Sequence, residues 1–157
     1  MNSRSQILLL LFAIGTGPGC IAESLEPDVG ELRAGLCKPE DSNPNQDVSF
    51  HKDILMNIFK RPPAMAGCTC HIPGSPRVTG LTLTGLDLSS YKALRRGGNQ
   101  SGSSVVVPRD PCNSLLIQKL SSAPPFGSRM PLDGPPYLTP AERTLISDWI
   151  AEGARDN

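Results

Sequence analysis

The sequence lacks the features typical of nucleic-acid-binding proteins, membrane-spanning proteins and hydrolases. No block of basic residues is longer than Arg95-Arg96, and 15 basic and 15 acidic side chains give a formal net charge of zero. A nucleic-acid-binding surface is therefore not expected. The longest apolar run, residues 7–14, is far shorter than the ~20 residues that span a bilayer. No nucleophile–base constellation and no pair of inward carboxylates is visible, so hydrolytic catalysis has no support.

Aromatic residues are scarce, whereas glycine and proline are abundant. The 157 residues include four Phe, two Tyr and one Trp, but 15 glycines and 16 prolines. This composition predicts long loops and few helices, and the length suggests one domain with some tail to spare. Clear apolar patterns survive in several places, so the chain is not expected to be disordered as a whole.

The first residues have the pattern of a secretory signal peptide. Arg4 precedes the apolar run at 7–14, and small residues follow it up to Cys20. We therefore expect residues 1–19 to be removed on export, into conditions where disulfides and covalent cofactor attachment can form. Cys20 stands where a bacterial lipoprotein signal places its lipidated cysteine, although Gly17-Pro18-Gly19 departs from the usual pattern. The sequence leaves lipidation open, and a lipid on Cys20 is the only membrane contact we expect.

The rest of the chain divides into a tether and one domain. Residues 20–46 carry scattered prolines, glycines and acidic side chains, which predict a flexible tether. Residues 47–157 contain the apolar patterns of helices, and we expect them to form an all-α domain.

Two amphipathic helices are expected near the ends of this domain. The first ends before Pro62-Pro63, and its apolar stripe consists of Ile54, Leu55, Ile58 and Phe59. The last follows a capping box, Thr139-Pro140-Ala141-Glu142, and its stripe consists of Leu145, Ile146, Trp149 and Ile150. A shorter helix, capped by Asn113 or Ser114, carries Leu115, Leu116, Ile117 and Leu120. So few helices leave the centre of the domain short of secondary structure to fill it.

Cysteine and histidine lie together at Cys68-Thr69-Cys70-His71. In an exported protein such a cluster is typical of haem attachment, metal binding or a structural disulfide. The c-type haem signature is Cys-x-x-Cys-His, in which two thiols add to the haem vinyl groups and the histidine ligates the iron. Here the motif is one residue shorter, and on a helix positions i and i+2 lie about 200° apart. Cys70 keeps its place beside His71, whereas attachment through Cys68 requires a distorted turn.

The surrounding residues strengthen the haem interpretation. In chain order they are the helix from Val48 to Phe59, Gly85-Leu86-Asp87-Leu88-Ser89-Ser90-Tyr91, Val106-Val107-Pro108-Arg109-Asp110-Pro111, Ser114-Leu115-Leu116, Arg129-Met130-Pro131, and Leu138-Thr139 through Trp149 to Ala154. With these segments the chain resembles the small c-type cytochrome domains of secreted bacterial proteins, particularly of planctomycete and myxobacterial type. The resemblance covers about two thirds of the 157 residues.

The resemblance implies a class I cytochrome c fold, with the first and last helices crossing beside one covalently attached haem c. By position, His71 would be the proximal iron ligand and Met130 the distal one, while Cys70, with or without Cys68, would hold the haem. Arg129 would either hydrogen-bond a haem propionate or lie at the surface. A thioether opposite a histidine leaves no iron site for a substrate. The expected function is therefore electron transfer with redox partner proteins, in the periplasm or on the outer surface of a bacterium, and not catalysis.

The number of cysteines favours haem attachment through two thioethers or none, whereas helix geometry favours attachment through one. If Cys20 is lipidated or removed, two thioethers would leave Cys37 and Cys112 for a disulfide between tether and domain. A single thioether at Cys70 would leave an odd number of thiols. The sequence thus leaves open whether haem is held by two thioethers, by one, or not at all.

Two other functions are also open. In a haemless descendant of the fold, Cys68 and Cys70 would join disulfides with Cys37 and Cys112, and the module would act in binding or anchoring. In a soft-metal site, Cys68, Cys70 and His71 would bind copper or zinc. Zinc lacks a convincing fourth ligand in this sequence, and Met130 would assist copper.

Overall fold

The computed structural model describes residues 37–157, and within this range the chain is helical without any β-strand. The helices are η1 (Pro39–Asp41), η2 (Phe50–Phe59), η3 (Pro63–Met65), η4 (Thr69–His71), α1 (Thr79–Thr84), α2 (Tyr91–Arg96), η5 (Gly102–Val105), α3 (Leu115–Leu120) and α4 (Pro140–Ala151). Together they hold 44% of these residues, so the all-α class is confirmed for this part of the chain. The predicted signal peptide (1–19) and Cys20 lie outside the described residues.

Helix η2 is the first of the two amphipathic helices predicted from the sequence. Ser49 caps it, because its hydroxyl accepts the backbone N–H of Lys52 at 3.2 Å. The helix has π-type hydrogen bonding, shown at its end by the Lys60 N–H, which donates to the Leu55 carbonyl five residues earlier at 2.9 Å. Its predicted apolar stripe is buried, together with Phe50 at its start.

Helix α4 begins with the capping box that the sequence predicted. The Thr139 hydroxyl accepts the Glu142 N–H at 3.2 Å, and the Glu142 carboxylate accepts the Thr139 N–H at 2.8 Å. The same carboxylate forms an ion pair with Arg61, just beyond the end of η2. These contacts fix the start of α4 and join it to the first amphipathic helix.

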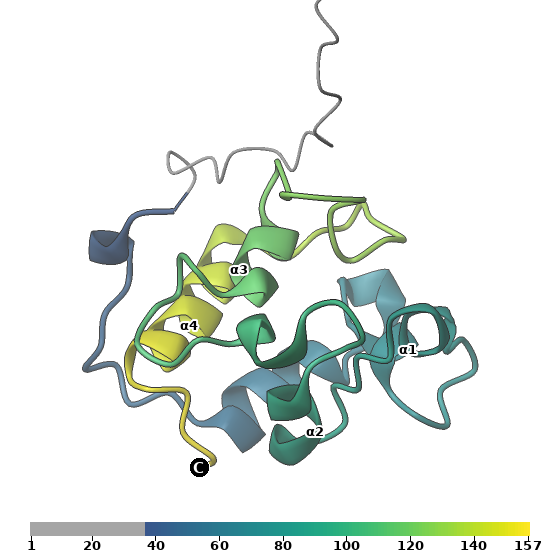
Figure 1. Ribbon diagram of the computed structural model, residues 1–157, viewed down its shortest axis with the longest axis horizontal. Helices are drawn as coiled ribbons and strands as arrows, with labels where there is room; N and C mark the ends of the chain where they lie inside the picture. Colours follow the sequence, from purple (N-terminus) through teal and green to yellow (C-terminus); the bar gives the residue numbers. More distant parts are fainter. Residues whose placement is uncertain (1–36) are drawn as a thin grey trace, which may run out of the picture.

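The core lies where η2 packs against α4 (Figure 1). The ring centre of Phe50 is 5.2 Å from that of Trp149 and 5.5 Å from that of Tyr91. The polar groups of these aromatics are satisfied, because the Trp149 indole donates to the Arg155 carbonyl and the Tyr91 hydroxyl to the Ala154 carbonyl, both at 2.9 Å. The scarce aromatic residues are therefore concentrated in one cluster.

The start of η2 is also held by Asn157. Its side-chain oxygen accepts the Phe50 N–H at 2.9 Å, and its amide donates to the Val48 carbonyl at 3.1 Å. Its backbone carbonyl accepts the His51 N–H at 3.0 Å. Backbone groups of a helix N-terminus that have no partner within the helix are thus satisfied by a residue distant in sequence.

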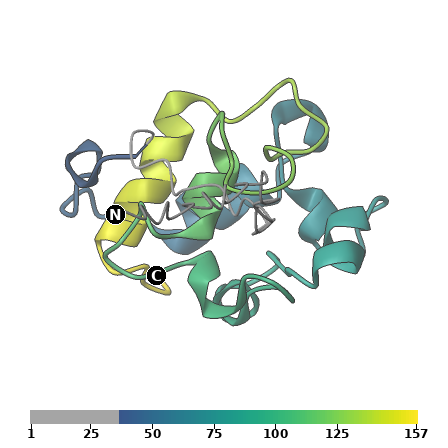
Figure 2. The same cartoon turned by 45° about the horizontal axis from the view of Figure 1, so that its top comes forward.

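The shorter helices cover the rest of the core. Helix α3 lies beside α4, α2 packs against η5, and α1 lies at the end of the molecule away from α4 (Figures 1 and 2). The sequence did not predict α2. It did predict a cap at Asn113 or Ser114, but the Ser114 hydroxyl instead accepts the Val107 N–H at 2.8 Å and donates to the Asp110 carbonyl at 2.9 Å.

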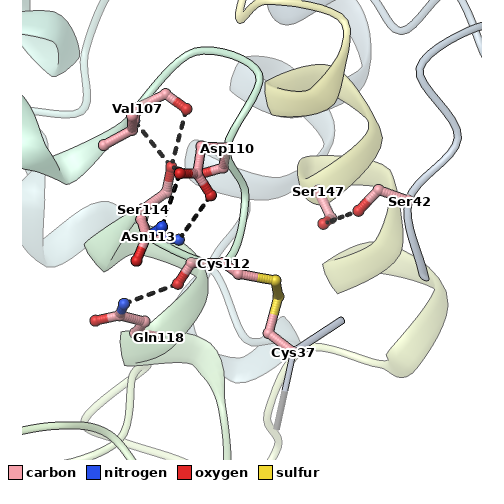
Figure 3. Close-up of a disulfide and its surroundings, with 9 residues drawn as sticks. All are labelled: Cys37, Ser42, Val107, Asp110, Cys112, Asn113, Ser114, Gln118 and Ser147. Carbon is pink, nitrogen blue, oxygen red and sulfur yellow. Dashed lines mark hydrogen bonds between the residues drawn. A yellow bond between two sulfur atoms is a disulfide. The ribbon is translucent and has the colours of Figure 1, made fainter. Parts of the chain in front are cut away.

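Residues 37–46, the end of the segment predicted to be a flexible tether, lie against α4. Cys37 forms a disulfide with Cys112, just before α3 (Figure 3). The hydroxyl groups of Ser42 and Ser147 are 2.6 Å apart, and the next residue also bonds to α4 through its backbone N–H. A covalent bond and hydrogen bonds therefore attach this segment to the domain.

Candidate functional site

The Cys68-Thr69-Cys70-His71 segment lies in a tight turn that follows η3 and is bonded to the end of η2. The Cys68 N–H donates to the Phe59 carbonyl at 3.0 Å, and the His71 N–H donates to the Cys68 carbonyl at 2.9 Å. The second bond closes the 3₁₀ turn η4. The rigid end of η2 thereby fixes the backbone from which both thiols and the imidazole project.

The two thiols of the motif differ in accessibility. Cys68 is buried and Cys70 is half-buried, and neither forms a disulfide. Burial raises the pKa of Cys68 to about 12, with a contribution from nearby Cys70. Burial also raises the pKa of Cys70, and the charge of Asp133 adds to this effect. Both groups are protonated thiols at neutral pH, and Cys70 is the one that a reactant can reach.

His71 is held in the form that ligates metals. Only 6% of the residue is exposed, and its Nδ1 atom lies 3.1 Å from the Leu86 carbonyl oxygen. Because a carbonyl can only accept, Nδ1 carries the proton and the lone pair lies on Nε2. Burial lowers the pKa of the imidazole, so the neutral form predominates at neutral pH. An N–H donated to a backbone carbonyl is the arrangement by which proteins orient ligating histidines.

The Nε2 atom of His71 faces helix α1 at Gly80. A Cβ atom added to Gly80 would lie 2.6 Å from Nε2, which is well inside contact distance. Only glycine therefore allows α1 to pack this closely over the imidazole.

Met130 lies in the 121–139 segment between α3 and α4, half-buried against the core. Its N–H donates to the Lys119 carbonyl at 2.8 Å. In contrast, Met56 and Met65 are 58% and 59% exposed. Among the methionines of the described range, Met130 is thus the one that the fold draws toward its interior.

An ion pair joins the Met130 segment to the motif segment. Arg77, six residues after His71, lies 2.6 Å from the carboxylate of Asp133, three residues after Met130. The charges of both partners also influence the Cys70 thiol, which places all three groups close together. The fold therefore brings together two stretches of chain that the sequence had linked only by resemblance.

Arg129 is partly buried, and one of its donor nitrogens has no acceptor among residues 37–157. Its guanidinium carbon lies 4.0 Å from the centre of the Tyr137 ring, and the residue is half-buried. Its Nε atom is buried without a hydrogen-bond partner among residues 37–157. The Nε atoms of Arg61 and Arg143 are in the same state, and such a donor can be satisfied by water or by an acceptor from a ligand.

Residues 37–157 show neither a three-residue metal cluster nor the cysteine pairing of the haemless alternative. Within residues 37–157, no group of three or more His, Cys, Asp or Glu side chains is placed to hold a metal, so Cys68, Cys70 and His71 do not form such a cluster. The disulfide joins Cys37 to Cys112. The pairing required by the haemless alternative, in which Cys68 and Cys70 bond to those two cysteines, is therefore not the one found.

Sequence reasoning missed several residues around this site. Gly80, Lys119 and the Arg77–Asp133 pair carried no signal in the sequence, since each acts through a contact between segments without regular periodicity.

Searches against protein-family models, curated proteins and solved structures found no match for the chain. No helix in the described part of the chain is long and apolar enough to cross a membrane.

Proposed function

We propose that this chain is a monohaem c-type cytochrome-like protein that transfers single electrons. In this proposal His71 is the proximal ligand and Met130 the distal ligand. The observation that carries it is the state of His71, a buried neutral imidazole whose Nδ1–H is committed to the Leu86 carbonyl and whose Nε2 lone pair makes no hydrogen bond among the described residues. An imidazole oriented in this way can bind a metal through Nε2.

Three further features support the proposal. Cys37 and Cys112 are bonded to each other, which leaves both thiols of the motif available for thioethers. The Arg77–Asp133 pair draws the Met130 segment to the motif segment. The packing of the first and last amphipathic helices against each other is also what a class I cytochrome c fold requires.

Each residue then has a defined role. Cys70 is the accessible thiol for covalent attachment, while buried Cys68 provides a second thioether only if the turn opens. The orphaned Nε of Arg129 would donate to a haem carboxylate. If His71 and Met130 both held a haem iron, the group would supply single-electron transfer and leave no open position for a substrate. The buried helix stripes and half-buried Met130 would keep water from it.

The cellular setting forms part of the same proposal. Residues 1–19 would direct export, and Cys20 would carry a lipid if the lipoprotein signal is used. The protein would then act in the periplasm or on the outer surface of a bacterium and exchange electrons with redox partner proteins. Tethering through Cys20 would leave the domain free to reach such a partner.

A pyridine haemochrome spectrum tests the proposal most directly. The full chain is expressed in an exporting host with c-type maturation, together with Cys68→Ala and Cys70→Ala variants. An α-band at the two-thioether position, shifted in each variant, indicates attachment through both sulfurs. A band at the single-thioether position that is lost only with Cys70→Ala indicates one attachment.

The same spectra separate the alternatives. Absence of haem, in a host that matures an ordinary cytochrome in parallel, contradicts the electron-transfer proposal and favours a haemless binding module. Copper or zinc retained on dialysis by the haem-free protein, and lost with His71→Ala, would favour the soft-metal site.

The ligand assignment has its own test. Met130→Ala opens the sixth iron position and is expected to lower the reduction potential of the haem-loaded protein. Met65→Ala is the matched control, since Met65 is 59% exposed and lies near the motif. An unchanged spectrum and potential in Met130→Ala would exclude this methionine as a ligand.

A further inference from the structure

Lys119, at the end of α3, is anchored in the segment that precedes Met130. Its ammonium nitrogen donates to the carbonyl oxygens of Phe126 and Ser128, at 2.6 and 2.7 Å. The same nitrogen lies 4.9 Å from the centre of the Phe126 ring. One side chain thus gathers three groups of the segment around a single charge.

The backbone of Lys119 holds the other end of the same turn. Its carbonyl oxygen accepts the Met130 N–H at 2.8 Å. The side chain therefore fixes residues 126 and 128, and the main chain fixes residue 130. Gly127, with φ +57°, passes close to the ammonium, where an added Cβ would lie 3.5 Å from the nitrogen.

The segment has no regular secondary structure, so contacts from side chains hold it in place. The 19 residues between α3 and α4 contain no helix or strand. Loops of this length without regular structure are uncommon and often functional. A flexible loop loses conformational entropy when one of its residues must occupy a fixed position. A residue that already holds the loop removes much of that cost before any ligand binds.

We propose that Lys119 is the positioning residue for Met130, holding its thioether where a distal iron ligand is required. This inference rests on the proposed function, since it assigns Lys119 a role toward the ligand and not toward the fold alone.

The test compares three variants of the full exported chain. Lys119→Leu keeps an aliphatic stem but removes the donors and the charge. Lys119→Arg keeps both and is the conservative rescue. Lys92→Ala is the matched control, because Lys92 is exposed on α2 and makes no side-chain contact among the hydrogen bonds and ion pairs of residues 37–157.

Two readouts are made on each variant. The first is local and independent of haem: hydrogen exchange of the Met130 amide, and the rate at which hydrogen peroxide converts Met130 to its sulfoxide. We expect both rates to rise about tenfold in Lys119→Leu, through local opening of the loop. They should stay within about twofold of the parent in Lys119→Arg and Lys92→Ala.

The second readout is the thioether-to-iron absorption band of the haem-loaded protein, with Met130→Ala as reference. The band should be lost or weakened in Lys119→Leu and retained in Lys119→Arg, while the unfolding midpoint of the arginine variant matches the parent. Unchanged exchange and oxidation of Met130 in Lys119→Leu would overturn the inference. So would a faster local opening accompanied by an unaltered band.

Failure of the proposed function gives a different pattern. If no haem is attached, or if Met130→Ala leaves the spectrum unchanged, the ligand role of Met130 fails whatever Lys119 does. The exchange and oxidation rates then still report whether Lys119 holds the loop, and the assignment to a haem ligand is overturned.

Discussion

The two ends of this domain are built differently. At one end, η2 and α4 are helices of 10 and 12 residues, and Phe50, Phe59 and Trp149 between them are completely buried. At the other end, η4 and α1 have three and six residues. There Leu83 is 73% exposed and Leu132 is 56% exposed.

The contrast extends to polar groups. In the aromatic cluster the indole of Trp149 and the hydroxyl of Tyr91 each have a partner. Around the motif, Nε2 of His71 makes no hydrogen bond to residues 37–157, and the thiols of Cys68 and Cys70 are unbonded. Buried guanidinium Nε atoms without a partner occur in both regions, at Arg129 and at Arg61 and Arg143. The first region buries large apolar side chains between two helices. The second combines short helical turns with exposed leucines and two unbonded thiols.

Removal of Trp149 should have the largest effect. Trp149→Ala deletes the centre of the aromatic cluster, and we expect the free energy of unfolding to fall by about 3–5 kcal/mol. Leu83→Ala, on exposed α1, is the control and should change it by less than about 0.5 kcal/mol. Urea unfolding followed by circular dichroism measures both. Similar losses in the two variants would contradict the division into a region that stabilises the fold and a less buried region around the motif.

A smaller effect is expected at Gly80. Gly80→Ala places a methyl group 2.6 Å from the Nε2 position of His71. Either α1 or the imidazole must shift, and the expected cost is about 1–3 kcal/mol. Thr82→Ala, at an exposed position of the same helix, is the control for helix propensity. Unchanged stability together with unchanged His71 NMR shifts would mean that α1 does not pack over the imidazole.

The subtlest effect is a dependence of stability on pH through His71. Burial lowers the pKa of His71 in the folded protein below the ordinary 6.5. At pH values between the folded and the unfolded pKa, the unfolded chain therefore binds more protons than the folded one. The free energy of unfolding therefore falls as the pH falls from about 7 through this window, and the loss is complete below the folded pKa. Unfolding titrations on the haem-free protein measure it.

The two histidines provide the comparison for that measurement. His71→Gln should flatten the pH dependence above the range where carboxylates titrate. His51→Gln is the matched control, since His51 is exposed and pairs at the surface with Asp156. Equal slopes in the parent and in His71→Gln would show that the imidazole is not protected from protons.

The sequence predicted the stabilising region well because its signals are local. The Thr139–Glu142 capping box and the stripe of α4 each lie within a few residues of chain, and both are observed. The same holds for the stripe of η2. Helix α2 was missed because its six residues offer only one turn and a half of apolar spacing. The predicted side-chain cap at Ser114 was wrong, because its hydroxyl accepts the N–H of Val107, seven residues earlier, and bonds to no N–H of α3.

The candidate site was predictable only in part. Residue type and adjacency singled out Cys70 and His71, but their environment depends on contacts that leave no periodic trace. The bond from His71 to Leu86, the approach of Gly80 and the anchoring of Lys119 all join segments of irregular chain. Such contacts follow from tertiary packing, which a single sequence does not encode in any local pattern.

The Cys37–Cys112 disulfide must form in competition with other cysteine pairings as the chain folds. The four cysteines of residues 37–157 permit three complete pairings, and Cys68 and Cys70 both lie between Cys37 and Cys112, which are 75 residues apart. Either motif thiol would close a shorter loop with Cys37 or Cys112 and would do so at lower entropic cost. Because exchange proceeds through thiolates, burial of Cys68, which raises its pKa, withdraws it from competition. The Cys37–Cys112 disulfide therefore forms in preference to the others only under one of two conditions. Either the turn that holds Cys68 and Cys70 packs first, or their thiols react with another group before Cys37 and Cys112 are joined.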